Sequence, residues 1–132
     1  MTGAAMAAAA VSNATSPPPP PSNDIVVTMT PSTYTANINS AGGTVPQFGA
    51  NASYPGGAQN AYTWEYQRLS GNTKLFISSV VPPTVSVGPK IIIGWNNVLV
   101  GEIVEATFRA IADNETYSSG IGLFVVRLTR TN

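Results

Sequence analysis

IVEATFRAIA, residues 103–112, and IGLFVVRLTR, residues 121–130, are the two segments that decide the fold. In the first segment apolar residues occupy every second position from Val104 to Ala112. An alternation with a period of two predicts a β-strand that buries one face. The acidic turn DNETYSSG, residues 113–120, separates the two segments and contains turn-forming residues. The two segments are therefore predicted to form a β-hairpin.

Shorter runs of the same kind lie between this hairpin and residue 24. In AYTWEYQRL, Tyr62, Trp64 and Tyr66 fall on one face, and the turn at 70–72 allows a hairpin into the run that follows. Pro46 limits the stretch 40–60 to an edge strand or a bulge. The chain is therefore predicted to be an all-β, antiparallel sandwich of roughly seven to nine strands. The other candidate strands are DIVVTM (24–29), STYTANIN (32–39), TKLFISS (73–79), TVSV (84–87), PKIIIGW (89–95) and NNVLVGEI (96–103).

The amino-acid composition argues against several classes of function. The 132 residues include no cysteine and no histidine, which removes disulfides, thiolate metal sites and the commonest general base. The formal net charge is zero and only 9% of residues are charged, so the chain lacks the basic stripe that binds nucleic acid or an anionic membrane. The sequence also lacks an apolar run of the roughly 18 residues that a membrane span requires. We expect neither enzymatic activity nor a cofactor.

The first 24 residues differ from the rest. Residues 1–24 combine an alanine run with five consecutive prolines, which predict an extended arm or linker ahead of one domain at 25–132. Such an arm cannot bury apolar surface by itself, so we expect it to lie on a neighbouring molecule. The residues expected to make that contact are Ala4, Ala5, Met6, Ala7, Ala8, Pro17, Pro18, Pro19, Pro20 and Pro21.

The segments YTWEYQRLSGN, LFISS, PPTVSV and GEIVEATFRAIADNETYSSGIGLFVVRLTR resemble immunoglobulin-like domains of bacteriophage virion proteins over about residues 60–130. The resemblance matches Trp64 to the core tryptophan of the third strand. It places Phe108 at the corner tyrosine and Ala110 at the second disulfide cysteine, and both differ from the usual residue. It implies that Trp64 packs on Phe108 and Ala110 without a disulfide. The expected core is Tyr62, Trp64, Phe108, Ala110 and Phe124.

The resemblance implies a non-enzymatic structural protein of the virion, either a capsid decoration or a tail accessory. Its partners would be other capsid or tail subunits, in a homo-oligomer or a symmetric array. The alternative is a secreted or surface-displayed carbohydrate-binding or adhesion module, in which Trp95 and Tyr54 are surface contacts with weak affinity for glycans. Core burial is the competing reading of Trp95.

The acidic residues give little support to a hydrolase. Glu102 and Glu105 differ by an odd number, so on one strand their carboxylates point to opposite faces and cannot flank one bond. Asp113, Asn114 and Glu115 offer fewer oxygens than the six to eight that calcium requires. A solvated turn is therefore the expected structure there.

Overall fold

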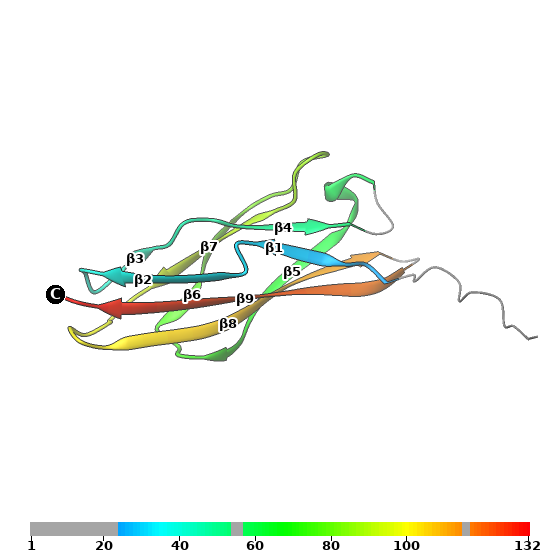
Figure 1. The fold of residues 1–132 in the computed structure, drawn as a ribbon. Coiled ribbons are helices and arrows are strands. Elements are labelled where there is room, and N and C mark those ends of the chain that lie inside the picture. The colour runs from blue at the N-terminus through cyan, green and yellow to red at the C-terminus, as the bar shows by residue number, and fades with distance from the viewer. Residues whose placement is uncertain (1–23, 54–56, 115–116) are drawn as a thin grey trace, which may run out of the picture.

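The computed structural model describes residues 24–53, 57–114 and 117–132, which form two β-sheets packed as a sandwich (Figure 1). The predicted contacts of the arm, Ala4 to Pro21, and of Tyr54 lie outside the described residues. A short 3-10 turn, η1 (Gln59–Ala61), precedes β5. The strands are β1 (Val27–Thr30), β2 (Thr33–Ile38), β3 (Gly43–Thr44), β4 (Phe48–Ala52), β5 (Thr63–Gly71), β6 (Leu75–Val81), β7 (Lys90–Trp95), β8 (Ile103–Asn114) and β9 (Tyr117–Arg130).

The first sheet is antiparallel and centred on β7. One edge of β7 pairs with β6 along its whole length. The other edge pairs first with β3, where Gly43 lies opposite Trp95, and then with β4, where Phe48 lies opposite Ile91. Pro46 falls between β3 and β4, where it need not donate to a ladder. The prediction that the stretch 40–60 holds only an edge strand or a bulge is wrong for β4, which pairs with both β1 and β7. β1 completes the sheet beside β4.

The second sheet has the order β2-β9-β8-β5. β8 and β9 form the predicted hairpin, and both strands extend further into the turn than expected, since Asn114 pairs with Tyr117. β2 pairs with β9 in parallel, from Thr33 opposite Val125 onward. The sandwich is therefore all-β as predicted but not wholly antiparallel. The reason is that the chain changes sheet at Pro31, which has no N–H to continue the β1 ladder.

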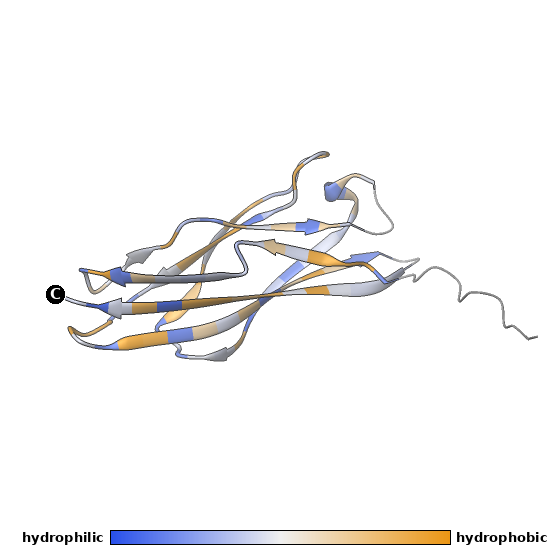
Figure 2. Ribbon diagram, viewed as in Figure 1, coloured by the Kyte–Doolittle hydropathy of each residue, from blue (hydrophilic) through white to orange (hydrophobic). Residues whose placement is uncertain are grey.

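Alternating side chains fill the space between the sheets, and Figure 2 shows hydrophobic segments interspersed with hydrophilic ones along both sheets. The centre of the core is aromatic. The ring centroid of Phe124 lies 4.8 Å from that of Phe48 and 5.5 Å from that of Phe108, and all three side chains are fully buried. Tyr62 and Ala110 are buried as well.

Trp64 occupies a different place from the one that the resemblance implied. It is half-buried and lies opposite Ala112, whereas Ala110 lies opposite Tyr66. Its indole N–H donates to the carbonyl oxygen of Gln59 at 3.0 Å. Trp64 therefore packs at the margin of the core and holds the η1 turn.

The side chain of Gln59 is the buried polar group beneath that turn. Its amide oxygen accepts from the backbone N–H of Ala52, and its amide nitrogen donates to the carbonyl of Ala52, both at 2.9 Å. One glutamine thus satisfies both backbone groups of a residue at the end of β4. The side chain takes the place of a neighbouring strand.

The predicted hairpin at 70–72 is wrong. β5 pairs with β8 and β6 pairs with β7, so the chain crosses from one sheet to the other at this turn. Gly71 permits the crossing, because its φ is 108° and a Cβ there would lie 2.5 Å from the backbone of Ala106. The guanidinium of Arg68 then donates to the carbonyl of Leu75 at 3.2 Å and joins the two edges.

Two other predicted strands are also absent from the described residues. Residues 84–87 form a bend, and residues 96–102 form a turn rather than a strand. In the second case Asn97 has a φ of 57° and Gly101 a φ of 84°, which an extended strand cannot contain. The run of apolar residues at 98–100 led to the prediction of a strand where the chain forms a turn.

The chain enters and leaves the sandwich at opposite ends (Figure 1). Asp24 forms a parallel bridge with Ser118 near the β8–β9 turn, and the N–H of Ile25 donates to Ser118 at 3.0 Å. At the other end the N–H of Thr131 donates to Ile38 at 2.9 Å. About 40 Å of β9 separates the two points, at roughly 3.3 Å per residue.

Candidate functional site

A groove of about 410 Å³ lies between β2 of the second sheet and β3 of the first, at the end of the sandwich that carries the C-terminus. Tyr34 and Trp95 contribute aromatic rings to it from opposite sheets. Most residues around them are small or carry neutral polar groups, and larger apolar side chains complete the lining. The small and polar residues are Ala36, Asn37, Asn39, Ser40, Gly42, Gly43 and Thr44, and the larger apolar ones are Ile38, Val45 and Leu128. The groove brings aromatic rings and neutral polar side chains together, which makes it a candidate binding site.

Trp95, which the sequence suggested as a surface contact, is half-buried in the wall of this groove. Its indole N–H donates to the carbonyl of Ser40 at 3.2 Å. A Cβ at Gly43 would lie 2.7 Å from two carbons of the ring, so the indole covers a position that only glycine can occupy. Trp95 therefore shapes the groove and does not project from it.

The strands beside the groove have free backbone edges. In the described part of the chain β2 pairs only with β9, and β3 pairs only with β7. Alternate N–H and C=O groups of such edge strands point away from the sheet and can pair with another extended chain. The residue pattern does not indicate this feature, because β2 has the ordinary alternation of a β-strand.

The groove is uncharged along its described lining, which contains neither acidic nor basic side chains. Ala36 and Gly42 carry little or no side chain, so they cover little of the backbone beside them. Backbone hydrogen bonds and close van der Waals packing are the interactions that such a surface offers. The arrangement fits a neutral extended peptide better than an anion or a cation.

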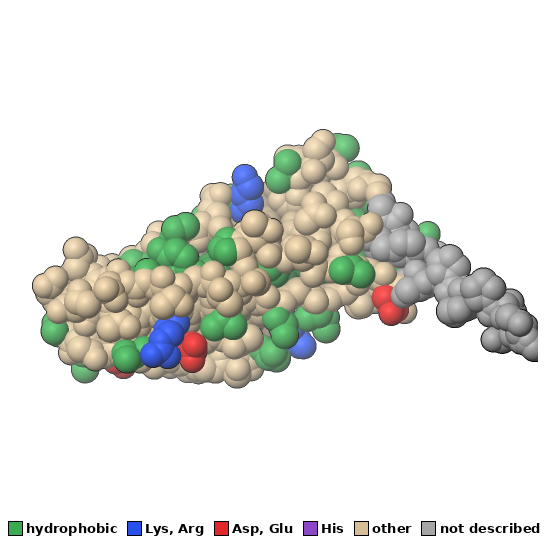
Figure 3. Space-filling model, viewed as in Figure 1, with side chains coloured by type: hydrophobic (Ala, Val, Ile, Leu, Met, Phe, Trp, Pro, Cys, Tyr) green, Lys and Arg blue, Asp and Glu red, His purple; other side chains and the backbone are tan. Residues whose placement is uncertain are grey.

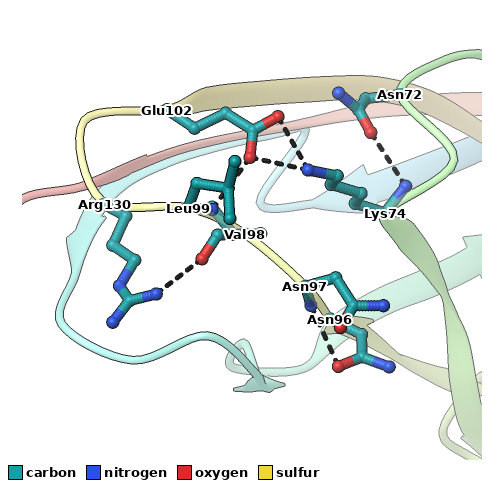
Figure 4. A network of polar contacts seen from close by, with 8 residues as sticks. All are labelled: Asn72, Lys74, Asn96, Asn97, Val98, Leu99, Glu102 and Arg130. Atoms are coloured by element: carbon teal, nitrogen blue, oxygen red, sulfur yellow. Dashed lines mark hydrogen bonds and ion pairs between the residues drawn. The ribbon is translucent and has the colours of Figure 1, made fainter.

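A polar network supports the loops at the same end (Figure 4). The Nζ of Lys74 lies 2.8 Å from Oε1 of Glu102, and that oxygen also accepts from the N–H of Leu99 at 2.9 Å. The Leu99 hydrogen bond, and then the Lys74 ammonium, lower the pKa of Glu102 from its ordinary value of 4.5. Glu102 thus stabilises the turn. Sequence reasoning missed this pair because 28 positions separate its members.

Two more contacts fix that turn against its neighbours. Arg130 donates from Nη1 to the carbonyl of Val98 at 2.7 Å, and Val98 donates its own N–H to Ala41 at 3.1 Å. The turn after β7, the loop between β2 and β3 and the C-terminal segment are therefore joined. This end of the groove is preorganised.

The remaining acidic candidates lie apart from the groove. Asp113 accepts a hydrogen bond from the hydroxyl of Ser119, near the β8–β9 turn, and Glu115 lies outside the described residues. In the ranges that the structure describes, no group of three or more acidic residues could hold a metal ion. Across the same ranges, none of the helical segments is long and apolar enough to cross a membrane.

The sequence was also compared with known proteins. It matches no protein-family model, and no curated protein is significantly similar to it.

Proposed function

We propose that this chain is a non-enzymatic structural protein of a phage particle, attached through its N-terminal arm and presenting an immunoglobulin-like domain on the particle surface. The observation that supports the immunoglobulin-like part of the proposal is the division of the first strand between the two sheets. β1 lies beside β4 in one sheet, and β2 continues in parallel beside β9 in the other.

The rest of the strand order supports the immunoglobulin-like assignment. In that fold strands A, B, E and D form one sheet, and C, F and G form the other. The corresponding orders here are β1, β4, β7, β6 and β5, β8, β9. The arm would lead away from the end of the domain at Asp24, so that the opposite end points outward from an attachment surface.

The face drawn in Figure 3 is consistent with a passive exterior. On the face drawn in Figure 3, charged side chains are few and scattered, and hydrophobic side chains form separate small groups. Such a surface lacks the large apolar patch that marks a stable interface. Attachment through the arm rather than through this face agrees with that distribution.

The test is the presence of the chain in particles. Mass spectrometry of density-purified particles, from a culture in which the chain is produced, should detect it at a fixed ratio to the major capsid protein. Deleting residues 1–22 should abolish that incorporation and leave the melting temperature nearly unchanged. A chain that is absent from purified particles, or that still joins them without the arm, would contradict the proposal.

A carbohydrate-binding module is the second candidate, and the aromatic groove favours it. Asn39 and Thr44 could donate to sugar hydroxyls beside Tyr34. The commitment of Trp95 to Ser40 and Gly43 weakens this candidate, since it leaves less of the ring free for stacking. A glycan array with no hits, or full binding by a Trp95→Ala variant, would count against it.

A further inference from the structure

We infer that the groove between β2 and β3 receives the N-terminal arm of another copy of this chain, so that copies join head to tail. The arm would enter as an added strand on the free edge of β2. The inference rests on the proposed function only in treating the arm as the attachment segment; it adds the identity of the receiving surface.

The groove has the properties that strand addition requires. An added strand obtains its affinity from backbone hydrogen bonds, and β2 and β3 both offer an unpaired edge in the described structure. Specificity comes from the side chains that fit between the strands. Ala36 and Gly42 present little or no side chain to the groove, the indole of Trp95 covers Gly43, and the lining carries no charge.

The sequence of the arm complements that lining. Residues 4–16, AAMAAAAVSNATS, contain no charged and no aromatic residue, and most of their side chains are alanine. Val11 and Thr15 add the β-branched character that favours strands. The prolines at 17–21 cannot donate to a ladder, so the inserted strand would end before them and they would span the distance between copies.

The position of Asp24 favours a neighbour over the same molecule. Asp24 and Ile25 run parallel to the start of β9, so the described chain begins beside the β8–β9 turn, at the end of the sandwich opposite the groove. The groove lies at the far end of β9, about 40 Å away at roughly 3.3 Å per residue. An arm and a receiver at opposite ends form a heterologous contact, which generates a ring or a filament.

Sedimentation of the full chain tests the inference. We expect the weight-average mass to rise with concentration from the micromolar to the millimolar range. A Thr44→Trp variant places bulk in the groove and should raise the dissociation constant at least tenfold. Thr35→Trp is the matched control, since Thr35 is also exposed but lies on the other face of β2, outside the groove.

A synthetic peptide of residues 1–22 gives a second measurement that needs no variant. It should return the associated full chain to monomers and shift the indole N–H resonance of Trp95, the tryptophan in the groove. A full chain that stays monomeric at every concentration overturns the inference. This holds equally if the groove binds the arm of the same molecule or a glycan. Equal association by the two tryptophan variants overturns it as well.

The two proposals can fail separately. A chain that associates through the groove but is absent from purified particles would contradict the proposed function and leave this inference standing. A monomeric chain that is incorporated into particles through its arm would contradict this inference and leave the proposed function standing.

Discussion

Replacing Gly120 by alanine should detach the root of the arm from the sandwich. A Cβ at this position would lie 2.1 Å from the carbonyl oxygen of Ile25 and 2.7 Å from its carbonyl carbon. Backbone atoms cannot rotate away as a side chain can, so the start of the first strand must move. Gly122→Ala is the matched control, because the new methyl group there meets side-chain atoms of Val27 and Met29.

The expected cost follows from the contacts of Ile25. Its N–H donates to Ser118, and losing one such hydrogen bond costs about 1 kcal/mol. Its side chain is 3% exposed, and uncovering an isoleucine costs about 1.5–3 kcal/mol. Gly120→Ala should therefore reduce the free energy of unfolding by about 2.5–4 kcal/mol. Gly122→Ala should cost nearer 1 kcal/mol, the lower end of overpacking penalties, because side chains can adjust.

Urea denaturation measures the two free energies, and amide hydrogen exchange locates the change. In Gly120→Ala the amide of Ile25 should lose its protection, whereas in Gly122→Ala it should remain protected. If Gly120→Ala costs no more than Gly122→Ala and leaves the Ile25 amide protected, the reasoning about the close approach of the two backbones is wrong.

Phe124→Ala should reduce the free energy of unfolding in chemical denaturation by about 3–5 kcal/mol, because it removes the central ring of the core. Trp64 is half-buried, so Trp64→Ala should cost less. A larger loss for Trp64→Ala would contradict the placement of Trp64 at the margin of the core. The carboxyl of Glu102 is more acidic in the fold than in the unfolded chain, so stability should fall as the pH drops below 4.5. The melting temperatures of wild type and Glu102→Gln should converge there, and a constant difference would exclude the Lys74 pair as a stabilising contact. Burial raises the pKa of Tyr66 from 10.0 to about 12, so stability should fall as the pH rises through that range, and less in Tyr66→Phe. Phenolate absorbance of the folded chain should show a step near pH 12 that this variant lacks.

The sequence predicts most of the strands because their alternation reports burial directly. Val104 to Ala112 are buried at every second position, and Trp64 and Tyr66 of β5 are both half-buried on one face, as expected. What the alternation does not report is the partner of each strand. β2 carries the same pattern whether its neighbour runs parallel or antiparallel, and the turn after Gly71 does not reveal that the chain changes sheet.

The candidate site was less predictable for the same reason. Trp95 could be singled out because tryptophan beside Gly94 and two asparagines is unusual, but its environment depends on Gly43 and Ser40, more than fifty positions away. The free edge of β2 is a property of the topology, since it exists only because the first strand divides between two sheets. Residue patterns carry no signal for it.

Gln59 bears on where the molecule can associate. Two strands side by side normally protect each other from unwanted pairing, and an unprotected edge is a starting point for aggregation. By bonding to both backbone groups of Ala52, the glutamine blocks the end of β4 against a foreign strand. At the groove, side chains occupy the carbonyls of Ser40 and Gly42 in the same way, whereas in the described residues β2 pairs with β9 alone. The end of β4 is thus protected against an added strand, and the edge of β2 is the place where one could pair.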